Sequence, residues 1–257
     1  MDRGLVPDHT VGRRSAGRSR RKRGTILEEM KLAKPRIDIG LSTNNIDALL
    51  PFWQDEAGIP FDHLLKIRRG QDQHRHDVLG SVLKINHFDE PLPDVPPSGY
   101  RELIVARAGA GAGRSLSDPD GNAVSVVEPG TNGIGQIAVR LAVRDLEAHR
   151  RFYTQAFGFP ERDYAKGAAF QAGESLILLE EDDSAPAEAE FRGRGWRYIT
   201  VQVFNADAEH ARVLAHGGRE ALAPVTLGKT ARISMVRDPD GNWIELSQRA
   251  SLVGSLA

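Results

Sequence analysis

The pentapeptide Asp-Pro-Asp-Gly-Asn occurs twice in the chain, at 118–122 and at 238–242. Proline at its second position presets φ for a turn, and glycine at its fourth position accepts a positive φ. Alternating apolar residues follow both copies, as "AVSVV" and as "WIELS". Each copy therefore predicts a β-hairpin corner, and the duplication predicts that a larger structural unit is repeated.

A second pair of segments repeats in the same way. They are 37–61, "IDIGLSTNNIDALLPFWQDEAGIPF", and 137–161, "IAVRLAVRDLEAHRRFYTQAFGFPE". Each begins as a short alternating strand and continues, after the cap-like Asn45 or Asp145, with apolar residues at helical spacing. A glycine, Gly58 or Gly158, follows where each helix should end. The sequence thus predicts two strand–helix–strand units.

The two repeats differ in length before their closing turns. Residues 134–248 predict two consecutive β-α-β-β-β modules, which is an α+β architecture. The first repeat has no counterpart of the helical segment "NADAEHARVLAHGG". In its place stands "DEPLPDVPPSG" at 89–99, whose prolines cannot sit in a helix interior. We expect the first repeat to lack its second crossover helix.

Five segments together form a recognisable family pattern. They are "LAVRDLEAHRRFYTQAFGF", "VLAHGG" and "RDPDGNWIELSQ" in the second half, and "NNIDALLPFW" and "LSDPDGNAVSVVEP" in the first. This pattern closely resembles the vicinal oxygen chelate superfamily, the fold of glyoxalase I, extradiol dioxygenases and bleomycin-resistance proteins. The resemblance implies two tandem glyoxalase-like domains whose modules form cup-shaped mixed sheets. We expect a disordered basic extension at 1–35, an abridged first domain at 36–130 and a second domain at 131–250.

The resemblance implies a small-molecule enzyme, of the lyase, isomerase or ring-cleaving dioxygenase type. The alternative is a non-catalytic binding or resistance protein with a degenerate metal site. In the superfamily a divalent metal (Fe, Mn, Ni, Co or Zn) is held by inward-facing residues on the first and last strands of each module. No Walker loop or dinucleotide fingerprint occurs in the sequence, so no nucleotide cofactor is expected.

The resemblance places four metal-ligand positions of the second domain at Ala138, Leu178, Tyr198 and Glu245. Ala138 and Leu178 cannot bind a metal, so only Glu245 matches the expected ligand type. Gln136 lies two residues earlier on the same strand face and is the candidate substitute. Gln136 and Glu245 are therefore candidate metal ligands, with Tyr198 and Glu245 as candidate catalytic groups.

In the first domain, "IDIGLS" alternates so that Asp38 faces the cup while its apolar neighbours face the core. In "SVLKINH" the same alternation turns Lys84 and Asn86 into the cup. Asp38 and Lys84 are candidate catalytic groups, Lys84 as a cation for a substrate carboxylate or enolate. The alternative is a structural carboxylate held in an ion pair, with Lys84 among its possible partners.

His74 and His76 form the second candidate metal pair. On a strand they would share one face, as an H-x-H pair requires. Their polar neighbours in "GQDQHRHD" favour an exposed loop tip instead.

Cysteine is absent, which excludes disulfides and thiol catalysis and fits a reducing cytoplasm. No apolar stretch approaches the ~20 residues of a membrane span, so we expect a cytoplasmic protein with no membrane partner. The basic leader contains "RSRRKR" at 18–23, read either as a nucleic-acid arm or as an unstructured extension upstream of a start at Met30. The acidic remainder favours the extension, so the expected partner is a small molecule, with homodimerisation allowed.

Overall fold

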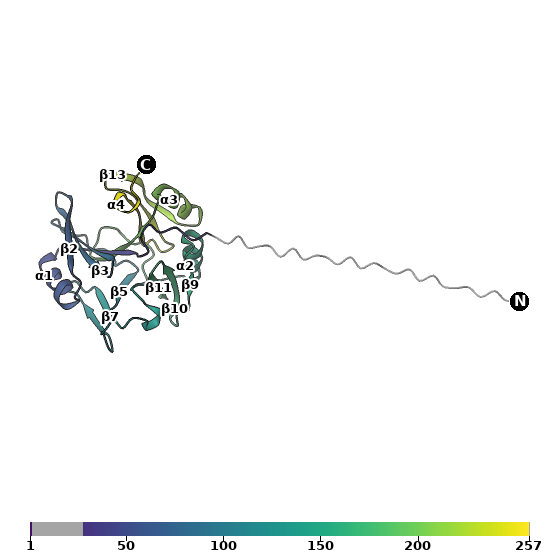
Figure 1. The fold of residues 1–257 in the computed structure, drawn as a ribbon, viewed down its shortest axis with the longest axis horizontal. Coiled ribbons are helices and arrows are strands. Elements are labelled where there is room, and N and C mark those ends of the chain that lie inside the picture. Colours follow the sequence, from purple (N-terminus) through teal and green to yellow (C-terminus); the bar gives the residue numbers. More distant parts are fainter. Residues whose placement is uncertain (2–27, 257) are drawn as a thin grey trace.

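The structure is a computed structural model that describes Met1 and residues 28–256. Two mixed β-sheets account for most of the fold, and the helices lie on their outer faces (Figure 1). The architecture is therefore α+β with two curled sheets, as the sequence predicted. The N-terminal strands (purple to blue in Figure 1) lie beside the C-terminal ones (green to yellow).

The eight-stranded sheet combines the first and the last modules of the chain, in the order β13-β14-β15-β12-β1-β4-β3-β2. The central strands β1 and β12 are antiparallel, with Asp38 opposite Thr200. On either side, β4 runs parallel to β1 and β15 runs parallel to β12. The strands are β1 (Asp38–Thr43), β2 (Phe61–Arg68), β3 (Gln71–Val78), β4 (Ser81–Phe88), β12 (Gly195–Gln202), β13 (Arg219–Leu227), β14 (Ala231–Arg237) and β15 (Trp243–Arg249).

The seven-stranded sheet combines the two middle modules, in the order β6-β7-β5-β8-β11-β10-β9. Its strands are β5 (Tyr100–Ala106), β6 (Arg114–Ser117), β7 (Ala123–Val127), β8 (Ile137–Val143), β9 (Glu161–Arg162), β10 (Gly167–Ala172) and β11 (Ser175–Glu181). β5, β6 and β7 have no helix between them, which confirms that this module lacks its crossover helix. The predicted position was wrong: β5 is the counterpart of β12, so the helix is missing after β5, at 107–113, whereas the proline-rich 89–99 precedes β5.

The pairing of modules corrects the sequence-based picture of one cup per domain. Each sheet takes one module from 36–130 and one from 131–250. The boundary near residue 130 separates the two sequence repeats, but it does not separate the two sheets. That 36–130 and 131–250 are two separate domains stays a prediction.

The helices follow the strands where the apolar spacing predicted them. They are α1 (Ile46–Pro51), α2 (Leu146–Phe152), α3 (Ala206–Ala215) and the short α4 (Ala250–Val253), with π-helical turns at Phe52–Glu56 and Tyr153–Phe157 and a 3-10 turn at Thr131–Gly133. Asp145 caps α2 by accepting from the Ala148 backbone N–H at 2.8 Å. Asn45 makes no such cap, and its side-chain NH₂ donates to Asp120 of the first repeated turn.

The two repeated turns clamp the two sheets to each other. Thr43 at the end of β1 donates to Asp120 at 2.5 Å, and the Arg144 backbone N–H after β8 donates to Asp240 at 2.7 Å. The Gly99 N–H, just before β5, donates to Asn242 at 2.6 Å. Each turn thus belongs to one sheet and binds the other, which explains why the motif occurs twice.

Residues 28–35 correct the predicted extent of the N-terminal extension. Met30 is buried in the main core, and Leu32 forms an isolated β-bridge with Val203. Lys34 forms an ion pair with Asp38 at 2.6 Å. The expectation of a disordered extension over 1–35 is therefore wrong for residues 28–35, while 2–27 lie outside the described residues.

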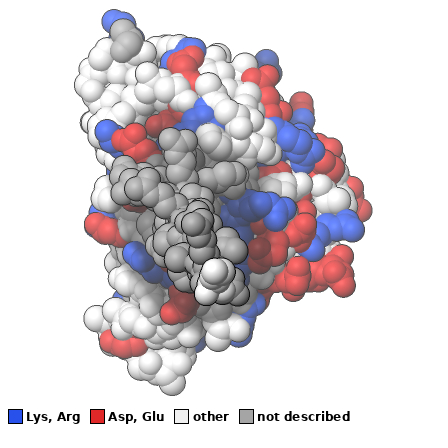
Figure 2. Space-filling view, turned by 90° about the vertical axis from the view of Figure 1, so that its right-hand side faces the viewer, with Lys and Arg blue, Asp and Glu red and all other residues white. Residues whose placement is uncertain are grey.

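Charges of both signs are interspersed on the face shown in Figure 2. Within the described residues, no helix is long and apolar enough to cross a membrane.

The second turn depends on a buried ion pair. His149 on α2 lies with Nε2 3.3 Å from the Asp238 carboxylate, and both side chains are fully buried. Burial alone would lower the pKa of His149, but Asp238 outweighs it and raises the pKa above its usual value. The pair therefore favours the charged form of His149.

We predict that His149→Leu lowers the free energy of unfolding by about 3–5 kcal/mol, because it leaves Asp238 buried and unpaired. Since folding raises the pKa of His149, its contribution is complete below the unfolded pKa of about 6.5 and is lost as pH rises through the folded pKa. Urea unfolding at several pH values measures the effect. His63→Gln, at an exposed pair with Asp62, is the control and should change little.

Candidate functional site

A cavity of about 450 Å³ opens on the concave face of the eight-stranded sheet. We call it the eight-strand cup. Its floor is polar and its walls, from β2 at one edge and β13 and β14 at the other, are apolar. The lining includes Leu65, Gln73, Arg75, Lys84, Asn86, Phe191, Tyr198, Leu222, Leu227, Ile233, Met235, Glu245 and Arg249.

Three side chains meet at the floor of the cup. The Lys84 ammonium donates to Thr200 Oγ1 at 2.6 Å and to Glu245 Oε2 at 2.7 Å. The Thr200 hydroxyl also donates to Glu245 Oε2, at 2.7 Å. Lys84 is 2% exposed, so this is a buried cation held by one carboxylate and one hydroxyl. We call these three residues the Lys84 triad.

The charges of the triad support one another. Burial would raise the pKa of Glu245, but Lys84 outweighs it and holds that pKa below its usual range. Burial lowers the pKa of Lys84, although Glu245 and Asp38 oppose the shift. Burial, together with the Glu245 charge, raises the pKa of the Tyr198 phenol, which therefore stays a neutral hydroxyl.

Tyr198 lies across the floor because β1 carries glycine opposite it. A Cβ at Gly40 would lie 2.3 Å from the Tyr198 ring, so only glycine allows this placement. The phenol accepts from Asn86 at 3.3 Å and from Gln73 at 3.5 Å, and Arg75 donates to Gln73 at 2.9 Å. Sequence reasoning did not single out Arg75 or Thr200. Alternation along β3 and β12 is the signal that could have placed them in the cup.

The predicted catalytic residues come together, although Asp38 does not reach the cavity. Lys84, Tyr198 and Glu245 line the cup, whereas Asp38 is fully buried beneath it. Its carboxylate accepts from Lys34 at 2.6 Å, from the Val82 backbone N–H at 2.9 Å and from Gln202 at 3.0 Å. Burial would raise the pKa of Asp38, but Lys84 and Lys34 together lower it. The structural-carboxylate interpretation fits these contacts.

Gln136 does not join Glu245. Its amide donates to Ser81 at 2.9 Å and to two backbone carbonyls beside it, and its carbonyl accepts from Ser175 at 2.7 Å. These contacts tie the β3–β4 turn to the seven-stranded sheet. The predicted pairing of Gln136 with Glu245 around one metal is therefore wrong.

His74 and His76 lie in β3, not on the exposed loop tip that their neighbours suggested. They share a strand face as an H-x-H pair would, but this is the face opposite Gln73 and Arg75. His76 is fully buried against Phe61, with ring centroids 5.6 Å apart, and burial lowers its pKa to about 4. The pair therefore faces away from the cup.

The seven-stranded sheet lacks an equivalent site. Register and repeat alignment place apolar or small residues at the positions of Asp38, Lys84, Thr200 and Glu245, namely Ala138, Leu178, Ile104 and Ser125. Tyr164 packs against this apolar patch. The sequence-based set of Ala138, Leu178, Tyr198 and Glu245 is thus divided between two sheets, and Glu245 instead joins residues of the first module.

The donor set of the eight-strand cup does not fit the divalent metal that the resemblance implied. The Lys84 ammonium lies among the oxygens that would have to bind the metal, and like charges exclude each other. No group of three or more His, Asp or Glu side chains within residues 28–256 is arranged to hold a metal ion.

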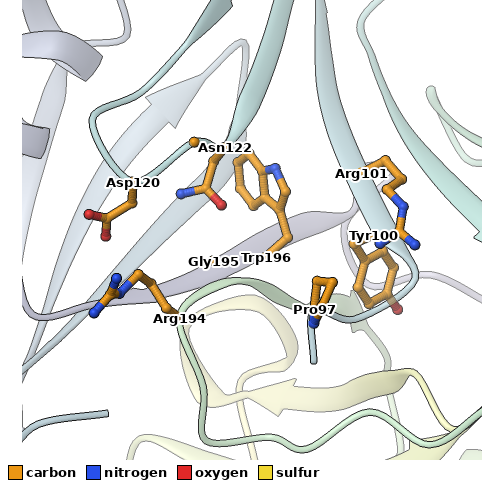
Figure 3. A pocket seen from close by; sticks show the side chains of 9 residues that line it. Pro97, Tyr100, Arg101, Asp120, Asn122, Arg194, Gly195 and Trp196 are labelled. Carbon is orange, nitrogen blue, oxygen red and sulfur yellow. The ribbon is translucent and has the colours of Figure 1, made fainter. Parts of the chain in front are cut away.

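A second hollow, of about 330 Å³, lies beside the first repeated turn (Figure 3). Arg101, Asp120, Arg194 and Trp196 line it. Asp120 is engaged by Thr43 in the clamp between the sheets, and Arg101 donates to the Ser98 carbonyl of its own segment, so both side chains already have partners.

Residues 133–246 match the model of the Glyoxalase/Bleomycin resistance protein/Dioxygenase superfamily. This match confirms the resemblance to the superfamily that the sequence indicated. No curated protein matches the chain.

Solved structures extend the similarity to both halves. A variant of glyoxalase I from Zea mays aligns with a TM-score of 0.65 at 14% identity, over 86% of this chain and 95% of that one. A proposed dioxygenase from Bacillus subtilis subsp. subtilis str. 168 aligns with a TM-score of 0.63 at 11% identity, over 87% and 86%. At these identities the likeness shows the shared two-domain glyoxalase fold.

We predict that Asp38→Asn lowers the free energy of unfolding by about 3–5 kcal/mol, because it removes the charge that Lys34 and Lys84 face. Urea unfolding measures this, and Glu174→Gln, at a half-exposed pair with Arg36, should cost less than about 1 kcal/mol. If Asp38→Asn were as stable as wild type but had lost ligand binding, Asp38 would be a functional carboxylate after all.

Proposed function

We propose that the eight-strand cup binds a small molecule with an acidic group and an apolar body, and that the protein is an enzyme that moves a proton on it. The single observation that carries this proposal is the Lys84 triad at the floor of an otherwise apolar-walled cavity. A cavity of about 450 Å³ has the size of a small-molecule site.

The charges of the lining favour an anion. Lys84 and Glu245 offset each other, so Arg75 and Arg249 leave the floor with an excess of positive charge. Arg75 is 5% exposed, and its Nε has no partner among the described residues. A buried guanidinium with a free N–H is a strong donor for a carboxylate. The walls formed by Leu222, Leu227 and Ile233 would hold the apolar body.

The triad supports proton transfer next to a carbonyl. Glu245 Oε2 is occupied by Lys84 and Thr200, which leaves Oε1 as the base for a carbon-bound proton. As the proton leaves, the electron pair of that C–H bond forms a carbon–carbon double bond and the carbonyl π pair moves onto oxygen, where the third N–H of Lys84 can stabilise the negative charge. Return of the proton from Glu245 to the γ-carbon of a conjugated enolate shifts the double bond, which is isomerisation, and departure of a β-leaving group with its own bonding pair gives elimination. Tyr198, as a neutral hydroxyl, orients the substrate.

Ligand sequestration without turnover is the second candidate. It is favoured by the same triad, because Lys84, Thr200 and Glu245 satisfy one another without a ligand. In that case Arg75 and Arg249 would hold the anion while the triad served as a rigid floor.

We predict that the apolar anion 8-anilinonaphthalene-1-sulfonate binds at one site per chain and that Arg75→Gln weakens its binding at least about tenfold. The loss of one charge-assisted hydrogen bond, worth about 1.5–3 kcal/mol, sets this magnitude. Fluorescence titration measures both numbers. Arg162→Gln, on an exposed part of the seven-stranded sheet, is the matched control and should leave binding unchanged. Equal binding by both variants would place the anion elsewhere.

We predict that Glu245→Gln abolishes turnover while anion binding stays within a few-fold of wild type. The measurement follows, by NMR in D₂O, the exchange of the carbon-bound proton in apolar 2-oxo acids that displace the fluorescent anion. General-base catalysis contributes about 10²–10⁴-fold, so the variant should lose that factor. Acids that bind to wild type without any exchange would instead identify a sequestering protein.

A further inference from the structure

The Lys84 ammonium lies where four strands direct their side chains to one point. β1 and β12 are paired so that Asp38 lies opposite Thr200, and β12 and β15 so that Thr200 lies beside Glu245. Lys84 on β4 lies beside Gly40 on β1, next to the same centre. The three pairwise distances within the triad are 2.6, 2.7 and 2.7 Å, which is a compact, fully bonded arrangement.

We propose that the Lys84 side chain takes the place of a divalent cation in the eight-strand cup, and that its removal opens a latent metal site there. The inference concerns only this chain's cation and does not depend on the proposed reaction. In this arrangement the Lys84 side chain places one positive charge at the floor of the cup. Glu245 and Thr200 supply the oxygens that would otherwise bind a metal.

The remaining charges explain why the wild-type cup should reject a metal. Arg75 and Arg249 line the same cavity, so any metal would meet three cations against the single carboxylate of Glu245. Asp38 beneath the floor is not free to bind a metal, because both of its oxygens already accept hydrogen bonds.

Replacing Lys84 by glutamate reverses this balance. Two carboxylates and a hydroxyl would then converge on one buried point, which is an oxygen-only set. Such sets suit hard cations such as Mn²⁺ or Mg²⁺. The seven-strand counterpart, with alanine, leucine, isoleucine and serine at these positions, offers no competing site.

The test is titration of the full-length protein with Mn²⁺, followed by the electron paramagnetic resonance signal of the free ion and by the shift of the melting temperature. We expect Lys84→Glu to bind one Mn²⁺ per chain at least about 100-fold more tightly than wild type, since charge count sets the affinity of such sites. Mn²⁺ should also raise the melting temperature of this variant alone.

Two controls separate a site from a general change of charge. Lys229→Glu makes the same charge change in an exposed turn and should not bind Mn²⁺. The double variant Lys84→Glu with Glu245→Gln keeps only one carboxylate, so it should lose most of the gain and bind Mn²⁺ only as weakly as Lys84→Gln, which has the same donor set.

Two results would overturn the proposal. The first is a wild-type protein that binds a stoichiometric divalent cation through Glu245, and the second is a folded Lys84→Glu that binds none. If Lys84→Glu does not fold, Lys84→Gln decides, because it frees Glu245 and Thr200 without adding charge. It should bind Mn²⁺ measurably above wild type, and no binding would refute the latent site.

Discussion

The reciprocal clamp made by the two Asp-Pro-Asp-Gly-Asn turns is the interaction on which the rest of the structure depends. In each turn the first aspartate, Asp118 or Asp238, accepts hydrogen bonds from the backbone and side chain of its own asparagine and reaches a helix of the other sheet, at Trp53 or His149. A buried carboxylate is tolerated only where such partners are complete. The two sheets can therefore pack closely only when both turns are in place.

Because each turn binds the opposite sheet, the chain closes on itself and its ends share one sheet. The first and last modules form the eight-strand cup, and the floor of that cup joins Lys84 to Glu245 across most of the sequence. A site built in this way requires the whole chain to fold first. It also explains how one cup can lose its polar positions, at Ala138 and Leu178, while the other keeps them.

Local features of this fold could be predicted from the sequence because they depend on neighbouring residues. The repeated turns, the strand–helix units, the missing crossover helix and the inward side chains of Lys84 and Glu245 all follow from spacing and alternation. The pairing of modules could not be predicted, since it is set by contacts between distant segments. Asp38 illustrates the difference: alternation gives its face correctly, but only the packing of Lys34 and Gln202 shows that water does not reach it. The loop predicted for His74 and His76 was wrong, because the prediction gave the polar neighbours more weight than the alternation of a strand, and the segment forms β3.

The contrast between the two sheets shows how a common scaffold controls charge at its centre. In the seven-stranded sheet the equivalent positions are apolar or small and uncharged, and the nearby Arg140 is neutralised by Glu102 at 2.8 Å and Glu180 at 3.3 Å. In the eight-strand cup Lys84 has only Glu245 as a direct carboxylate partner, while Arg75 and Arg249 at the floor have no carboxylate partner among the described residues. A buried excess of positive charge is unfavourable unless an anion arrives to balance it. The cup therefore gains most from a ligand that brings its own negative charge, and the tethered ammonium fixes the point at which a second negative charge can develop.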